Sequence, residues 1–505
     1  MAMTDMTSIK PGRWDVTRRG FIRAAGAVLV TACGNERATA EQAAAYTPEG
    51  FGAKGDGRTN DTAAFQALSA AINARSGGTV MLRKGAVYIV GGSKPADPKR
   101  SGGYTFTPAD ILRFTDCRNA VVVHGNGATL RAVDGYRFGT FSSDGAPTRN
   151  ALPYYGPQIA AGYSAMIFVE GCSGSVLIEN LELDGNVGRA RIGGPWGDAG
   201  YQLPGSGLQF RNNSGRWRVV NVRAHHHPLD GIHVNDPGDA TTPPSGSGTE
   251  GCDFDQNGRQ GLSLVGGVGH IFRTSKFRRT RRDGVPVQSA PGAGVDLEAE
   301  GGRVVRDIRF ERCEMSDNVG VAFLHGGGPV SNITVVDSLL LGTTTWSYYS
   351  SGAKSVRFVR TRIVGAVVNL IGGEQGEVFE DCLLTNDPAE APRGQTPFSP
   401  SGFIIQDAVR GVRFIRGEIR NGQPVSSRNG NLDQMTLEGT TIRATAGSLI
   451  VYGRCSKGCR FVEDGGTIGG LPGGADGKVT IGQAEDGWSL VRRGRTTRFP
   501  ATVRR

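Results

Sequence analysis

Gly207-Leu208-Gln209-Phe210-Arg211 recurs with the same apolar pattern at 231–235, 261–265, 294–298 and 320–324. Each copy begins with glycine, and the starts lie 24, 30, 33 and 26 residues apart, which is the spacing of coils in a repeat solenoid. Because strand side chains alternate between two faces, the apolar positions are expected to stack inside and the others outside. The repeat therefore predicts stacked strands with an inner column for packing and an outer column for chemistry.

A second pattern lies between these copies. The segment 176–183 recurs at 308–315, 333–340, 356–363 and 412–419. The central apolar residues of the later copies are Phe310, Val335, Phe358, Phe379, Phe414 and Leu437. The runs alternate with period two and are rich in Val, Ile and Phe, which is typical of strands and excludes an α-helical solenoid. Two strands per coil predict an all-β fold, a parallel β-helix.

The opening of the chain carries a family resemblance. Phe51-Gly52-Ala53-Lys54-Gly55-Asp56-Gly57-Arg58-Thr59-Asn60-Asp61-Thr62, together with 65–67, 77–82 and 88–90, resembles the start of pectate-lyase-superfamily proteins. The resemblance implies a right-handed single-stranded parallel β-helix that acts on polysaccharides. Subfamily motifs are not found as sets, so the resemblance leaves the subfamily open.

The residues near this motif also predict a short helix. Phe65, Leu68 and Ile72 are spaced to form one apolar face, and Asn60 or Asp61 could cap the N-terminus. An open β-solenoid end exposes backbone edges that promote aggregation. We therefore expect an N-terminal capping helix over the first coil.

Three regions follow from these patterns. Residues 1–45 are predicted to be an export signal and linker, 46–470 the β-helix, and 471–505 a basic segment that could cap its other end. Residues 17–23, followed by an apolar run, resemble a twin-arginine signal. Val30-Thr31-Ala32-Cys33-Gly34 resembles a lipobox, so we favour a lipid on Cys33 over simple cleavage further along the chain. The expected location is periplasmic, extracellular or anchored to the outer membrane.

The eight cysteines indicate packing rather than zinc binding. Cys313 and Cys382 share an aligned interior position, where a small residue is expected. Cys455 and Cys459 lie four apart and could form a disulfide in an oxidising compartment. No Cys-x-x-Cys pair occurs.

The charge of the chain is basic. The formal net charge is +10, and because five basic and two acidic residues lie in the first 32, the remainder carries +7. This excess favours an acidic polysaccharide as partner, with ordinary solubility charge as the alternative. The basic run 273–282 is accompanied by no binding fold or aromatic cluster for bases, so nucleic-acid binding is not expected.

The outward columns define a candidate site. One column would hold Gln209, His233, Ser263 and Asp296, and the next would hold Arg211, Asn235 and Glu298. Asp296 and Glu298 could be a glycosidase pair, or with Asn235 they could bind Ca²⁺ as hard oxygen ligands. The remaining alternative is a solvated polar face.

Other residues are assigned roles around this pair. His233 is a candidate general base, and Asp230 begins the same segment as a substrate-binding candidate together with Gln209, Asn235 and Ser263. Arg211 and Arg259 are expected to clamp a uronate carboxylate, because guanidinium groups bind carboxylates in a bidentate way. His225-His226-His227 could hold a metal, but alternation should split their faces and few acidic residues are nearby in the sequence, so a metal site there is not expected.

These residues favour an exported lyase that cleaves an acidic polysaccharide by β-elimination. That reaction needs a base, an acid for the leaving oxygen and a cation for the developing charge. His233 or an arginine is expected to be the base, and Asp296 with Glu298 the metal ligands or acid. The alternatives are a glycoside hydrolase, a uronate epimerase and a non-catalytic carbohydrate-binding surface protein.

Overall fold

The structure is a computed structural model, and it describes most of the chain beyond residue 44. The described residues are 45–96, 104–149, 159–194, 203–326, 328–342, 346–351, 354–364, 367–371, 376–385, 404–407, 411–421, 424–427, 435–450, 453–471, 482–484 and 487–501. The predicted signal and Cys33 lie outside these residues. By its contacts the chain divides into Met1–Ala43 and Ala44–Arg505, and the fold below is that of the second unit.

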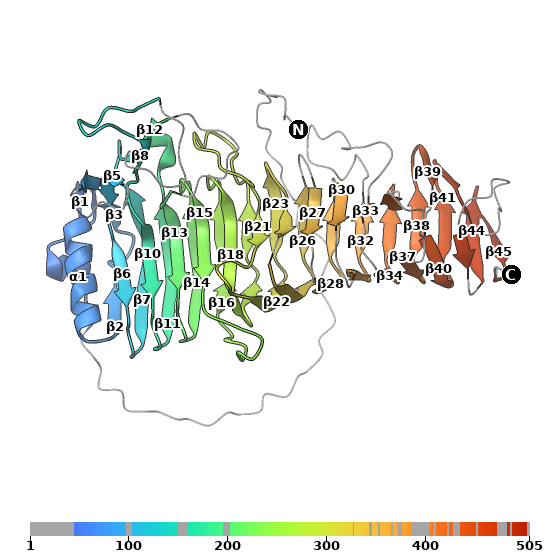
Figure 1. Ribbon diagram of the computed structural model, residues 1–505, viewed down its shortest axis with the longest axis horizontal. Helices are drawn as coiled ribbons and strands as arrows, with labels where there is room; N and C mark the ends of the chain where they lie inside the picture. Colours follow the sequence, from blue (N-terminus) through green and yellow to red (C-terminus); the bar gives the residue numbers. More distant parts are fainter. Residues whose placement is uncertain are drawn as a thin grey trace. The chain divides into compact units, whose positions relative to one another are not determined.

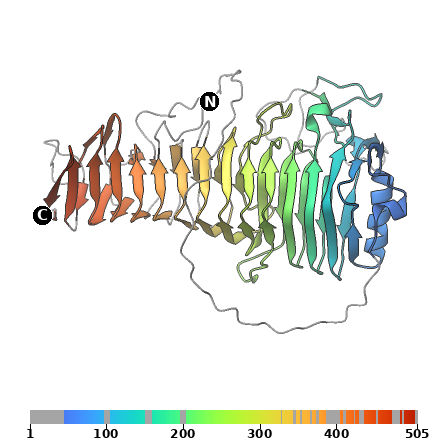
Figure 2. The same ribbon diagram turned by 180° about the vertical axis from the view of Figure 1, so that it is seen from behind.

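The second unit is the predicted right-handed single-stranded parallel β-helix, and this fold class is confirmed. Figures 1 and 2 show its strands following one another along one axis. We call one continuous parallel ladder wall 1. Wall 1 consists of β6 (Leu112–Thr115), β10 (Ala165–Glu170), β13 (Ser206–Arg211), β15 (Asp230–Asn235), β18 (Gln260–Val268), β21 (Val295–Leu297), β24 (Phe323–His325), β27 (Trp346–Ser351), β30 (Val367–Ile371), β33 (Ile404–Asp407) and β36 (Pro424–Ser427).

The other ladder, wall 2, changes along the stack. It begins with β2 (Gly78–Met81) and β3 (Val87–Val90), which both pair with β7 (Val121–Ala132), and it continues with the long strands β11 (Val176–Asp184) and β14 (Trp217–His225). Later coils contribute two shorter strands each. Examples are β22 (Val305–Glu311) and β23 (Glu314–Asn318), β25 (Val330–Val336) and β26 (Leu339–Gly342), β28 (Lys354–Val359) and β29 (Arg362–Val364), and β34 (Val412–Ile415) and β35 (Glu418–Arg420).

The register of wall 1 confirms four of the five repeats. Leu208, Ile232, Leu262 and Val295 pair in turn and are fully buried, as the inner column requires. The fifth repeat was aligned wrongly. Val295 pairs with Phe323 instead of Val321, so the chain is displaced by two residues and Leu324 lies beside Asp296. A shift of two preserves the face of every side chain, which is why the alternation alone could not reveal it.

The inner column of wall 2 has the predicted register throughout. Phe310, Val335, Phe358, Phe379, Phe414 and Leu437 pair in turn. The ring planes of Phe358 and Phe379 are stacked with centroids 5.0 Å apart, and those of Phe379 and Phe414 are 4.9 Å apart. Fully burying a side chain of this size contributes roughly 1.5–3 kcal/mol, so this aromatic column is a main source of stability. Cys313 and Cys382 are buried and free, consistent with a packing role.

The N-terminal end carries the predicted helix α1 (Thr62–Ala74). Phe65, Leu68 and Ile72 form its fully buried face. Figure 1 shows α1 at the end of the strand stack, where the Asn73 amide donates to the Arg113 carbonyl of β6 at 2.9 Å. Asp61 is the N-cap residue, and its side chain makes no capping bond; the Asn60 side-chain oxygen, one residue earlier, accepts from the Thr62 backbone N–H at 3.0 Å.

At the other end the parallel ladder runs past residue 470. β44 (Trp488–Arg492) pairs in parallel with β41 (Arg460–Glu463), and β45 (Arg495–Phe499) folds back antiparallel on β44. The segment predicted as a C-terminal cap therefore contains a further ladder strand and a terminal hairpin. Cys459 is disulfide-bonded, while the side chain of Cys455 is outside the described residues, so their pairing stays a prediction. Within the described parts of the chain, no helix has the length and apolar character needed to cross a bilayer.

Candidate active site

The outward column of wall 1 forms one continuous row of paired residues. The row runs Arg113, Phe168, Gln209, His233, Ser263, Asp296, Leu324 and Tyr349. The first four predicted members, from Gln209 to Asp296, are therefore neighbours. Successive members lie about 4.8 Å apart, the separation of strands in a sheet.

Asp230 organises the centre of this row. Its carboxylate receives two bonds from Arg259, from Nε to Oδ1 at 2.8 Å and from Nη2 to Oδ2 at 2.6 Å. The same Oδ2 lies 3.5 Å from Nδ1 of His233. Asp230 and Arg259 are both buried. Arg259 is thus committed to a protein carboxylate, which makes it a positioning residue and not the exposed clamp expected from the sequence.

The charges of this group determine the state of Asp230. Burial alone would raise the pKa of Asp230, but the Arg259 guanidinium and the hydrogen bond with His233 outweigh burial and hold the pKa below its ordinary value. Asp230 is therefore ionised and orients the His233 ring through Nδ1. The other ring nitrogen, Nε2, is the one left to act on a substrate.

Asp296 is the opposite case, a buried carboxyl whose pKa is raised instead of lowered. Burial, reinforced by the negative charge of Glu298, raises the pKa of Asp296 to about 7. Its Oδ2 accepts a short hydrogen bond from the Gln260 amide, and its buried Oδ1 has no partner among the described residues. A carboxyl that is half protonated near neutral pH can donate a proton to a leaving oxygen.

Asn235 and Glu298 do not form the predicted second column as one row of paired residues. β21 ends at Leu297, so Glu298 lies beyond the strand and is exposed. A bulge shifts Asn235 into register with Gly266, where Val265 was expected between Asn235 and Glu298. Although the residue is exposed overall, partial desolvation of its carboxyl group and the like charge of Glu300 raise the pKa of Glu298. The three residues predicted to bind Ca²⁺, Asp296, Glu298 and Asn235, therefore do not lie in one paired row. Calcium binding by them stays a prediction.

Two further predicted residues lie on either side of the centre. Arg211 is bound to Glu170, with Nε to Oε1 at 2.8 Å, and its guanidinium lies 5.0 Å from the centre of the Phe168 ring. Ser263 is buried between His233 and Asp296, with Oγ 3.4 Å from Nη2 of Arg259. Arg211, like Arg259, already has a carboxylate partner within the protein.

Sequence reasoning missed two residues of this region. Gln260 pairs with Asp230 in register and donates to Asp296. Its position directly before a repeat glycine, equivalent to Asp230, was a usable signal. Arg303 follows β21 and reaches back to bond the Asn212 side chain, crossing beside Gly266. No sequence signal marks Arg303, because that contact spans 91 residues.

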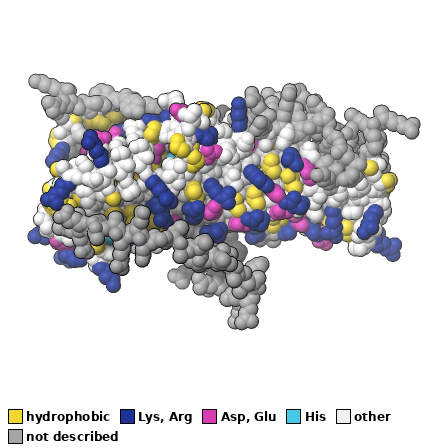
Figure 3. Space-filling model, turned by 90° about the horizontal axis from the view of Figure 1, so that it is seen from below, with side chains coloured by type: hydrophobic (Ala, Val, Ile, Leu, Met, Phe, Trp, Pro, Cys, Tyr) yellow, Lys and Arg dark blue, Asp and Glu magenta, His cyan; other side chains and the backbone are white. Residues whose placement is uncertain are grey.

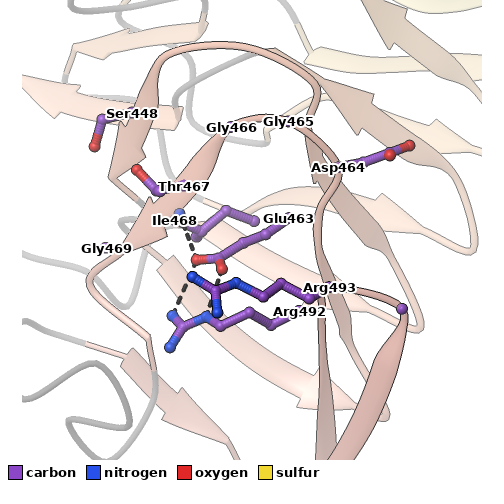
Figure 4. A pocket seen from close by; sticks show the side chains of 11 residues that line it. Ser448, Glu463, Asp464, Gly465, Gly466, Thr467, Ile468, Gly469, Arg492 and Arg493 are labelled. Atoms are coloured by element: carbon purple, nitrogen blue, oxygen red, sulfur yellow. Dashed lines mark hydrogen bonds and ion pairs between the residues drawn. The ribbon is translucent and has the colours of Figure 1, made fainter.

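Two cavities lined by described residues lie away from this row, and the first is near the C-terminal end of the stack. It has a volume of about 640 Å³, and Figure 4 shows Glu463 beside Arg492 and Arg493 in it. Although burial opposes it, bonding to Arg492 keeps the pKa of Glu463 below its ordinary value, so this carboxylate is no proton donor. A second cavity of about 480 Å³ near Asn60 and Lys94 is lined by no carboxyl except Asp110.

No protein-family model matches the chain, and no curated protein matches it in sequence. Among solved structures, it is similar to the A-module of a mannuronan C-5 epimerase from Azotobacter vinelandii, with a TM-score of 0.48, 14% identity and coverage of 84% of this chain and 97% of that chain. The Agl-KA catalytic domain has a TM-score of 0.43 at 14% identity, covering 89% and 69%. A tailspike protein of E. coli bacteriophage HK620 in complex with a pentasaccharide has a TM-score of 0.43 at 11% identity, covering 88% and 81%.

Proposed function

We propose that the protein is a polysaccharide lyase that cleaves an acidic polysaccharide by β-elimination. The observation that carries the proposal is that one row of wall 1 holds both a candidate proton acceptor and a candidate proton donor. His233 is oriented by an ionised Asp230, and Asp296 retains a proton up to about pH 7. A base and an acid held on one rigid sheet are what elimination requires.

The proposed roles follow from the order of the row. His233 and Asp296 are separated by Ser263, so their backbones lie about 10 Å apart, which leaves room for one sugar residue between the side chains. Nε2 of His233 removes the proton on C5 of a uronate. The C4–O4 bond then breaks, a C4–C5 double bond forms, and Asp296 donates its proton to the departing O4.

A cation is needed because negative charge develops on the uronate carboxylate. Arg211 and Arg259 are held by Glu170 and Asp230, so neither is the leading candidate. The described partner of the Arg303 guanidinium is the neutral amide of Asn212. We assign the carboxylate-binding role to Arg303, which lies beside the Asn235 and Gly266 positions of the same wall.

Aromatic side chains extend the row on the other side of Asp296. Tyr349 lies two coils further along, and its ring centre is 5.1 Å from that of Trp346. Both side chains are partly exposed. Amphipathic rings stack on the apolar faces of sugars, so these two residues support a further sugar-binding position.

The test is a panel of acidic and neutral polysaccharides assayed for three products. Unsaturated products that absorb in the ultraviolet, formed from an acidic polysaccharide, are expected. New reducing ends without that absorbance would replace the lyase with a hydrolase, and altered uronate composition without chain cleavage would indicate an epimerase. Binding without any of these changes would overturn the enzymatic proposal.

A glycoside hydrolase is the second candidate because Asp296 and Glu298 influence each other. The charge of Glu298 contributes to the raised pKa of Asp296, as in a pair of carboxyls that share catalytic work. In that case Glu298→Gln would lower turnover as strongly as Asp296→Asn. In the lyase, Glu298→Gln is expected to have the smaller effect.

A further inference from the structure

A second histidine site lies where β14 leaves wall 2. His225 is the last residue of this strand and His226 is the first residue of the turn that follows. Asp184 is the last residue of β11 in the preceding coil. One donor atom from each residue lies within 4.8 Å of the others. The Nδ1 atoms of His225 and His226 are 2.7 Å apart, and Nδ1 of His225 is 3.8 Å from Oδ1 of Asp184. We call these three residues the histidine corner.

The expectation that few acidic groups approach these histidines was wrong. Asp184 and Glu182 are contributed by the neighbouring coil, 41 to 43 residues earlier in the chain. Alternation was also expected to split the histidine faces. It does not separate His225 from His226, because His226 adopts a left-handed backbone conformation with φ of 53° and the chain turns there.

The corner is oriented by contacts behind the donor atoms. Oε1 of Glu182 lies 3.1 Å from Nε2 of His225, so the Nε2–H points to this carboxylate and Nδ1 keeps its lone pair. Metal-binding histidines are usually held by a carboxylate in this way. The His225 side chain is only 8% exposed, which fixes its direction.

We propose that the histidine corner binds Zn²⁺ or a similar divalent transition-metal ion through Asp184, His225 and His226. Two imidazole nitrogens and one carboxylate oxygen are a donor set that suits zinc, whereas calcium and magnesium prefer oxygen ligands alone. Zinc bonds of about 2.0–2.1 Å place tetrahedral ligands roughly 3.3 Å apart. The two donor distances in the corner, 2.7 and 3.8 Å, lie below and above this value. Small side-chain rotations would therefore complete a three-ligand site and leave a fourth coordination position open.

The surrounding charges permit a cation. Arg131 Nε lies 3.4 Å from Oδ2 of Asp184, which leaves Oδ1 toward the histidines. Arg223 lies between the carboxylates of Glu182 and Asp255, at 3.3 and 3.5 Å. The site is independent of the proposed lyase activity.

The test is zinc binding to the intact protein by calorimetry, and cobalt substitution followed by visible spectroscopy. His226→Asn is the main variant, because asparagine tolerates a positive φ. His225→Gln and Asp184→Asn are further variants, and Asp184→Asn retains the acceptor for the Asn186 N–H. His124→Gln is the matched control, since His124 also contacts one carboxylate, Glu179, at 2.7 Å but lies beside no second histidine in the described contacts.

One zinc ion per chain is expected, unaffected by excess calcium, with cobalt giving the intense visible bands of tetrahedral coordination. His226→Asn should weaken zinc binding at least a hundredfold while circular dichroism stays unchanged, and His124→Gln should bind like the parent. Absence of zinc binding, or equal binding by the parent and His226→Asn, would overturn the proposal. These readouts do not involve polysaccharide, so they are separate from the test of the lyase.

Discussion

Two histidines on neighbouring coils are each held by carboxylates, but their surroundings give them different chemistry. At His233 the carboxylate of Asp230 is occupied by Arg259, so the negative charge is neutralised and no cation is needed. At the other site Asp184 is also near a guanidinium, since Arg131 Nε lies 3.4 Å from Oδ2, whereas Oδ1 is the oxygen 3.8 Å from Nδ1 of His225. The nearest additional group to His225 is a second imidazole. A guanidinium that binds both carboxylate oxygens therefore favours a proton site, and a second imidazole beside the histidine favours a metal site.

The two sites also differ in burial. The Asp230 side chain is fully buried, whereas that of Asp184 is 22% exposed. A buried ion pair loses much when one partner is removed, since the remaining charge has no solvent to compensate it. Substitutions at the proton site should therefore lower the free energy of unfolding, whereas substitutions at the metal site should mainly weaken metal binding. Four predictions test this contrast, in decreasing order of expected effect.

The largest effect is expected from Asp296→Asn. The amide cannot supply the proton for the leaving group, so turnover should fall by about 10²–10⁴-fold, the usual contribution of a general acid. Zinc binding at the histidine corner should be unchanged, and calorimetry on the same preparation checks this. Turnover within tenfold of the parent would remove Asp296 from the mechanism.

Arg259→Met should be the most destabilising change. It leaves Asp230 charged and buried, so the free energy of unfolding should fall by about 3–5 kcal/mol in urea denaturation. The matched change at the other site, His226→Asn, should cost much less. Adding Asp230→Asn to Arg259→Met should restore part of the loss, and equal losses in the single and double variants would contradict the buried pair.

Stability should depend on pH through Asp296. Its pKa of about 7 in the fold lies above the ordinary value of 3.8, so the folded protein binds more protons and the free energy of unfolding falls as pH rises from 4 to 7. The difference corresponds to about 4 kcal/mol. Urea denaturation at several pH values measures it. Asp296→Asn should flatten this part of the profile, and an unchanged slope would refute the assignment.

The smallest effect is expected from Arg303→Gln. If Arg303 binds the uronate carboxylate, KM for an acidic polysaccharide should rise about five- to tenfold, in line with the loss of one exposed charge contact of about 1 kcal/mol. Arg218→Gln is the control, because Arg218 forms an exposed pair with Glu250 on wall 2. Figure 3 shows basic and acidic side chains intermingled in the same way on the face it presents. Equal effects of the two variants would exclude a specific role.

Part of the candidate site could be predicted from the sequence. The glycine-led repeats gave the correct neighbours for Gln209, His233, Ser263 and Asp296, because inserted loops do not change which face a side chain occupies. The shift of Asn235 into register with Gly266 and the end of β21 before Glu298 could not be predicted, because a bulge and a strand end leave the local alternation of the sequence unchanged. Arg259 was selected as a substrate clamp, but its bond to Asp230 is visible only in the folded chain.

The sequence by itself determined the β-helix, its inner columns and the face of the polar residues within the repeats, because a period of two is a local property of the chain. Only the tertiary structure decided which polar groups meet. Gln260 and Asp296 are 36 residues apart, and His225 and Glu182 are 43 apart. Loops of unequal length join the coils, so the register between distant coils depends on how the whole stack packs, and that packing sets the charges and pKa values on which both sites depend.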